Sequence, residues 1–115
     1  MNTAPAAIAV LIEGNVAPTS HGVNFDKEDY SAVVENMLLG AVALGYASVW
    51  LDSPFWDGER QKKALALLGA ETCHLWAVLP IGKPDGEGSR REKLPFSARV
   101  SYNRYEPTDL ISQQF

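Results

Sequence analysis

The stretch that decides the fold runs from Asp26 to Leu51 and reads DKEDYSAVVENMLLGAVALGYASVWL. Its first turn is acidic, and the carboxylates of Asp26 and Asp29 suit both the free amides and the positive dipole end of a helix start. We therefore expect a helix to begin here. Apolar residues then recur at three- and four-residue spacing, which predicts one continuous apolar face made of Tyr30, Val33, Val34, Met37, Leu38, Ala41 and Val42.

The same stretch also predicts where this helix ends. Gly45 follows the last periodic residue, and glycine adopts the left-handed conformation that commonly terminates a helix. The next four residues, Ser48–Leu51, are short, β-branched or aromatic, as strand residues usually are. The chain is therefore expected to pass from the helix directly into a strand.

Upstream of the helix, Ala6–Ile12 is apolar without polar alternation, which is typical of an interior strand that is covered on both faces. Residues 13–25 are rich in Gly, Asn, Pro and Ser, so they predict a loop. His21 lies in this loop without other metal-ligand types at ligand spacing, and we assign it no role.

Downstream, residues 52–58 place a carboxylate, a hydroxyl and two aromatic side chains at the end of a strand, where ligands often bind. Asp57 is predicted to cap a second helix, which Gly69 should end. His74–Ile81 predicts a third strand, with Pro80 near its end, where a missing amide donor does least harm.

Two groups of chemically reactive residues are interpreted without a function. Cys73 and His74 are adjacent, but neighbours in a strand point to opposite faces, which argues against a Cys/His nucleophile pair. Arg60, Lys62 and Lys63 are interpreted as the solvated face of the second helix rather than as an anion-binding patch.

The last third of the chain begins with a loop rich in Gly, Pro and charge at 82–92. A tail follows at 97–115, in which residues 99–102 are β-prone, but its apolar residues are too few for it to fold alone. We expect one domain over 1–115, with a strand and helix core at 1–96 and a tail that packs on a partner subunit. The pattern of strands and helices, taken alone, is typical of a small α/β layer structure.

Composition limits the protein to a few classes. The 115 residues suffice for one domain, and a net charge of −4 with 46% hydrophobic and 21% charged residues indicates neither disorder nor general nucleic-acid binding. The single cysteine excludes an internal disulfide framework. We expect a cytoplasmic protein, because we find no secretory signal pattern and the apolar run at 4–12 is too short to span a bilayer.

Several motifs, in order and spacing, resemble the C-terminal half of the FMN-dependent nitroreductase family. Individually they are common, but together they extend through nearly the whole chain. They are Glu35-Asn36-Met37-Leu38-Leu39, Ala43-Leu44-Gly45-Tyr46, Ser48-Val49-Trp50-Leu51, Leu67-Leu68-Gly69, Ala77-Val78-Leu79-Pro80-Ile81-Gly82-Lys83-Pro84 and Val100-Ser101-Tyr102-Asn103-Arg104-Tyr105.

This resemblance implies an α+β fold with a mixed β-sheet and flanking helices, assembled as a homodimer with FMN bound at the subunit interface. It implies hydride transfer from NAD(P)H to the flavin and then to an acceptor such as a nitroaromatic, a quinone or an enone. In such enzymes the cofactor supplies the chemistry, while the protein positions and tunes it.

The resemblance also assigns cofactor-binding residues. It places the backbone amides of Asp52 and Ser53 against the flavin N5 edge. Arg91 and Lys93 match a cation-x-cation-Leu-Pro pattern that contacts the FMN phosphate, and Arg90 replaces Arg91 if the register slips by one residue. Arginine and lysine both suit a phosphate monoester, although composition alone favours a solvated loop at this position.

The N-terminal half of the family fold, with its Arg/Ser-rich phosphate motif, has no counterpart in the sequence. We therefore expect weak FMN binding by this chain alone, and a partly uncovered face on the 30–44 helix unless a partner covers it. Two alternatives stay open: a non-catalytic dimerising or interaction module derived from this fold, and a Rossmann-like phosphate-binding domain. The latter ranks last because residues 14–18 do not provide GxGxxG.

Overall fold

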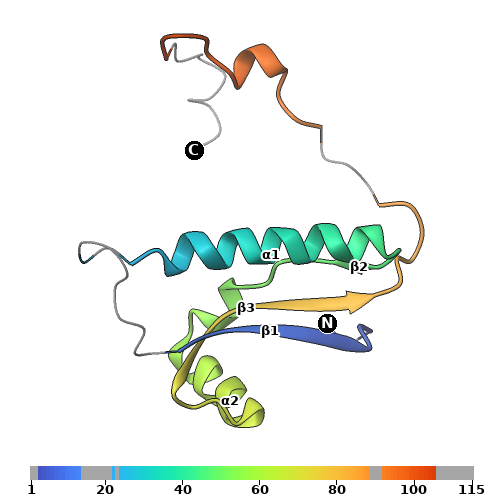
Figure 1. Cartoon of the computed structure of the whole chain (residues 1–115). Coiled ribbons are helices and arrows are strands. Elements are labelled where there is room, and N and C mark those ends of the chain that lie inside the picture. The colour runs from blue at the N-terminus through green and yellow to red at the C-terminus, as the bar shows by residue number, and fades with distance from the viewer. Residues whose placement is uncertain (1–2, 14–21, 23, 89–91, 106–115) are drawn as a thin grey trace.

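The computed structural model describes residues 3–13, 22, 24–88 and 92–105. Its elements follow one another in the order β1 (Ala6–Glu13), α1 (Asp26–Ala43), β2 (Ala47–Ser48), a 3-10 turn η1 (Ser53–Phe55), α2 (Gly58–Leu68), β3 (Cys73–Gly82) and a second 3-10 turn η2 (Phe96–Ala98). Figure 1 shows a three-layer arrangement in which α1 lies on one side of the strands and α2 on the other.

The sheet has the strand order β1-β3-β2, and both pairs are antiparallel. The expected α+β class is therefore confirmed, whereas the parallel sheet of an α/β layer structure is not formed by the described strands. The prediction that Ala6–Ile12 is an interior strand is wrong, because β1 lies at an edge of this sheet and β3 is central. An apolar run alone does not distinguish a central strand from an edge strand.

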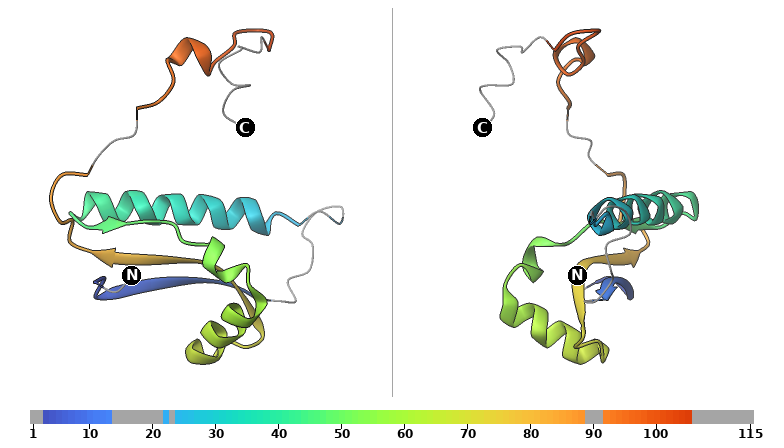
Figure 2. Two further views of the ribbon diagram at one scale, coloured as in Figure 1. Left: turned by 180° about the vertical axis from the view of Figure 1, so that it is seen from behind. Right: turned by 60° about the vertical axis from the view of Figure 1, so that its left-hand side comes forward.

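The two helices cover opposite faces of the sheet with separate apolar clusters. On the α1 face, Val34 packs with residues from β1 and β3, and the cluster consists of Val10, Val34, Ala77 and Leu79. On the α2 face, the cluster consists of Leu65, Leu75 and Val78. The second view in Figure 2 shows this separation, with α1 and α2 on either side of the strands.

Both ends of α1 lie where the sequence predicts them, but the N-terminal cap differs from the expectation. Its C-terminus ends as predicted: Gly45 has φ of 77°, its N–H donates to the Val42 carbonyl, and the Tyr46 N–H donates to the Ala41 carbonyl. Its N-terminus begins at Asp26 with an acidic first turn, as predicted, but the cap residue is Phe25 and no side chain of the acidic turn caps the helix. Instead, the Asn24 side-chain oxygen accepts the Asp26 amide at 2.7 Å.

The remaining predicted boundaries are confirmed with one interruption. Asp57 caps α2 by accepting the Glu59 amide at 3.0 Å, and Gly69 ends α2 with φ of 65°. The strand expected at Ser48–Leu51 is reduced to β2 and a single bridge between Leu51 and Val78. The β-prone residues 99–102 form no strand in the described part of the tail.

Replacement of Leu79 by alanine tests the central position of β3. The Leu79 side chain has no exposed surface, so truncation should lower the free energy of unfolding by about 2–5 kcal/mol. The matched control is Leu67→Ala, because Leu67 is 90% exposed and its truncation should change stability by only about 0.5 kcal/mol. Urea unfolding of the variants measures both values, and equal losses would contradict this description of the core.

Candidate functional site

A β-bulge in β3 positions the first residue of the candidate site. Val10 of β1 lies opposite Ala77, but the next residue, Leu11, lies opposite Leu75, so Trp76 is an extra residue in β3. The bulge lets Trp76 and Ala77 both pack on the α1 face, while Leu75 turns to the α2 face. A bulge therefore re-aims a large aromatic side chain at one end of the sheet.

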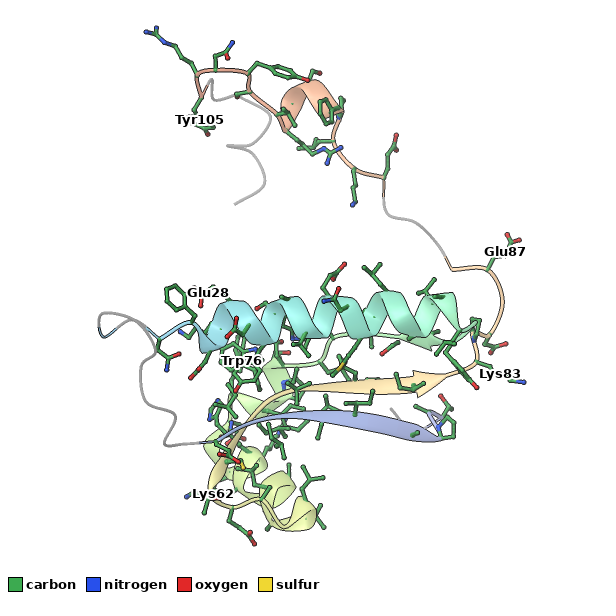
Figure 3. The ribbon with its side chains drawn as sticks, viewed as in Figure 1. Glu28, Lys62, Trp76, Lys83, Glu87 and Tyr105 are labelled. Atoms are coloured by element: carbon green, nitrogen blue, oxygen red, sulfur yellow. The ribbon has the colours of Figure 1, made fainter. Side chains whose placement is uncertain are left out.

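Trp76 lies in a group of rings beside the first turns of α1, as Figure 3 shows. Its ring centroid is 6.4 Å from that of Tyr30 and 6.1 Å from that of His74. The indole nitrogens of Trp76 and Trp50 are buried and have no hydrogen-bond partner among the described residues. A buried donor without a partner costs about 1–3 kcal/mol, so both groups are suited to an acceptor from outside this part of the chain.

A hollow of about 230 Å³ adjoins this aromatic group. It is lined by Asp52, Phe55, Trp56, Gln61, His74, Leu75 and Trp76. The Gln61 side chain donates to the Phe55 carbonyl at 3.1 Å, which ties η1 to α2. Ligand pockets usually measure about 300–1,000 Å³, so this hollow is smaller than a typical ligand pocket.

Asp52 and Ser53 are the residues that the resemblance assigns to a flavin edge. Asp52 lines this hollow, and Ser53 is the first residue of the adjoining turn η1. The Phe55 and Trp56 amides close η1 by donating to the Asp52 and Ser53 carbonyls, at 2.9 and 3.3 Å. The Asp52 and Ser53 amides themselves have no hydrogen-bond partner within the described part of the chain. Two backbone donors beside an aromatic hollow thus have no partner among the residues that the structure describes.

Of the predicted phosphate-binding cations, the described part of the chain includes only Lys93. Arg90 and Arg91 lie outside the described residues. Lys93 is exposed, does not line the hollow, and belongs to residues 92–105, which stand apart from the sheet in Figures 1 and 2. Arg99 gives this segment local structure by donating from Nε to the Leu94 carbonyl at 2.7 Å.

The sequence indicated residues 52–58 as a place where a ligand could bind, but it did not indicate the β3 residues His74, Leu75 and Trp76 that also line the hollow. His74 and Trp76 are two positions apart, so a strand places both side chains on the same face, and this spacing was the signal that could have indicated them. The bulge that turns Trp76 to the same face as Ala77 has no Gly or Pro beside it to indicate it. Among the described residues, no cluster of three metal-ligating side chains occurs, and no helix is both long and apolar enough to cross a membrane.

Burial raises the pKa of Tyr30, and the negative charges of Asp26, Asp29 and Glu13 raise it further. Both causes disfavour the phenolate, because ionisation would place a negative charge in a partly buried site beside carboxylates. Tyr30 is therefore held as a neutral hydroxyl at one side of the aromatic group.

Comparison with known proteins agrees with this architecture. No family model and no curated protein matches the chain. Among solved structures, the chain is similar to a protein named as an NADH dehydrogenase/NAD(P)H nitroreductase from Bacteroides thetaiotaomicron, with 25% identity and a TM-score of 0.64. It is also similar to a nitroreductase family protein from Clostridium difficile, with 25% identity and a TM-score of 0.67.

The chain has a nitroreductase-like fold. The similarity covers 86% and 90% of this chain, but only 55% and 62% of the two solved chains. This nitroreductase-like chain therefore corresponds to little more than half of either structure.

A spectrophotometric titration tests the environment of Tyr30. One tyrosine should ionise above the ordinary pKa of 10.0, which gives the titration curve a late component at high pH. Tyr30→Phe should remove this late component. Since the unfolded chain releases the proton near its ordinary pKa and the folded chain at higher pH, the free energy of unfolding should fall across that window. It should fall less in Tyr30→Phe.

Tyr102→Phe is the matched control, because Tyr102 is 77% exposed and its loss should leave the late component in place. Loss of the late component in Tyr102→Phe instead of Tyr30→Phe would contradict this description of Tyr30.

Proposed function

We propose that this chain supplies half of an FMN site in a homodimeric, cytoplasmic oxidoreductase. The reaction would pass hydride from NAD(P)H to a nitroaromatic, quinone or enone acceptor. The observation that carries the proposal is the pair of free amides, at Asp52 and Ser53, beside an aromatic hollow in a nitroreductase-like fold.

The residues at the hollow fit one edge of a flavin ring. Phe55, Trp56 and Trp76 offer flat apolar surfaces, as a planar ring system requires. The buried indole N–H of Trp76 needs an acceptor, and the flavin ring has carbonyl oxygens and ring nitrogens that accept hydrogen bonds. The Asp52 and Ser53 amides would donate to the N5 edge. Bound FMN supplies the hydride chemistry, and these groups hold and orient it.

The phosphate end of the cofactor is assigned to Arg91 and Lys93, with Arg90 as the substitute for Arg91. Lys93 does not lie at the hollow of its own chain, and the hollow is smaller than a typical ligand pocket. Both facts favour a site that a second subunit completes. In that assembly residues 92–105, and the tail to 115, would pack on the partner subunit.

A second candidate function is a non-catalytic interaction module. It is favoured by the apolar side chains that α1 and its C-terminal end leave exposed: Val33 at 43%, Leu39 at 59%, Val42 at 69% and Leu44 at 77%. Exposed apolar surface of this kind commonly marks a protein–protein interface. The chain would then keep the dimerising surfaces of the fold without binding flavin.

Flavin titration of the purified protein tests the first proposal. The native chain should quench or shift the FMN spectrum, and Arg91→Ala with Lys93→Ala should weaken binding by about tenfold or more, since charge-assisted hydrogen bonds contribute about 1.5–3 kcal/mol each. Arg60→Ala with Lys63→Ala is the matched control, because it removes one arginine and one lysine from exposed positions on α2.

The two candidate functions give different results in these measurements. Flavin binding that falls equally in both double variants would contradict the assigned phosphate contacts. A stable oligomer in sedimentation that binds no FMN in equilibrium dialysis would favour the interaction module. NAD(P)H oxidation by a flavin-loaded dimer would exclude the module.

A further inference from the structure

Asp52 is the one residue with a formal charge at pH 7 among the described residues that line the hollow. The other lining residues are apolar, aromatic or neutral: Phe55, Trp56, Gln61, His74, Leu75 and Trp76, with the histidine counted as neutral. Asp52 is half-buried, so water screens its carboxylate less than it screens an exposed carboxylate. The formal charge at the wall of the hollow is therefore negative.

The Asp52 carboxylate has no structural task in the described part of the chain. An aspartate before a helical turn usually caps that turn, but the Asp52 side chain accepts no hydrogen bond from η1. The ion pairs formed by the described residues involve the carboxylates of Asp57 and Glu59 instead. Among these residues, Asp52 has no cation paired with it.

The carboxylate of Asp52 stays close to the backbone amide of the same residue, because only a few covalent bonds join the two groups. The proposed function assigns that amide to the N5 edge of the flavin. Any ring system that accepts a hydrogen bond from the amide therefore has a negative charge beside it. This consequence does not depend on which other residues complete the site.

From this geometry we infer that the Asp52 carboxylate lowers the reduction potential of bound FMN, an inference that rests on the proposed function. A hydride from NAD(P)H carries two electrons and one proton, and its transfer leaves NAD(P)⁺ and a flavin ring with one additional negative charge. The oxidised ring is neutral. A nearby negative charge disfavours the anionic form, so the chain should bind reduced FMN less tightly than oxidised FMN.

His74 is the other titratable residue among the described residues that line the hollow, and its ring centroid lies 6.1 Å from that of Trp76. A neutral imidazole leaves the negative charge of Asp52 in place, whereas an imidazolium would offset it. The effect of Asp52 is therefore measured at about pH 8, above the range in which histidine side chains ordinarily gain a proton.

The reduction potential of FMN bound to the full chain, measured by equilibration with a reference dye, tests the inference. Asp52→Asn keeps the backbone amide and the side-chain shape but removes the charge. Reduced FMN should then bind about tenfold more tightly relative to oxidised FMN, which raises the potential by about 30 mV for a two-electron couple. Asp85→Asn is the matched control, because it removes one carboxylate from an exposed position away from the hollow.

The conservative variant Asp52→Glu keeps the charge, so its potential should stay near the native value. Equal potentials in the native chain and in Asp52→Asn, with FMN bound to both, would overturn the inference and leave the proposed function standing. An equal rise in Asp85→Asn, or in Asp52→Glu, would also overturn it. A native chain that binds no FMN in equilibrium dialysis would overturn the inference and the proposed function together.

Discussion

The structure depends on β3 being the only described strand with a neighbour on both sides. It connects β1 and β2, which make no ladder with each other, and it supplies buried residues to the clusters under both helices. Leu75, Ala77 and Leu79 are almost fully buried. Because these residues serve two faces, β3 has to be apolar on both, and this explains the uninterrupted apolar sequence from Leu75 to Ile81.

The elements that local chemistry controls could be predicted from the sequence. The helix end at Gly45, the Asp57 cap and the stop at Gly69 each depend on a few neighbouring residues, and all three are confirmed. The sheet order could not be predicted, because the apolar runs of β1 and β3 look alike and only long-range pairing makes β3 central. The start of α1 at Asp26 is confirmed, but the sequence did not indicate that the Asn24 side chain, two residues earlier, accepts the Asp26 amide.

The candidate site was predictable in part for the same reason. Asp52 and Ser53 stand directly after a strand segment, and the structure places Asp52 at the hollow and Ser53 in the adjoining turn. Trp76 reaches the same end of the sheet through a bulge, which is a property of two paired strands rather than of one. Lys93 is separated from the hollow in a single chain, so its assigned role depends on an assembly that one sequence does not describe.

The central position of β3 also has a consequence for synthesis on the ribosome. Glu13 pairs with Cys73, 60 positions later, and Ala6 pairs with Ile81, 75 positions later, so the main ladder joins residues that are remote in the chain. Such high contact order makes folding slow, since the loop has to close before any pairing contributes. The apolar β1 segment therefore leaves the ribosome long before β3 is synthesised. In that interval it is the first segment that a chaperone for exposed apolar chains would bind.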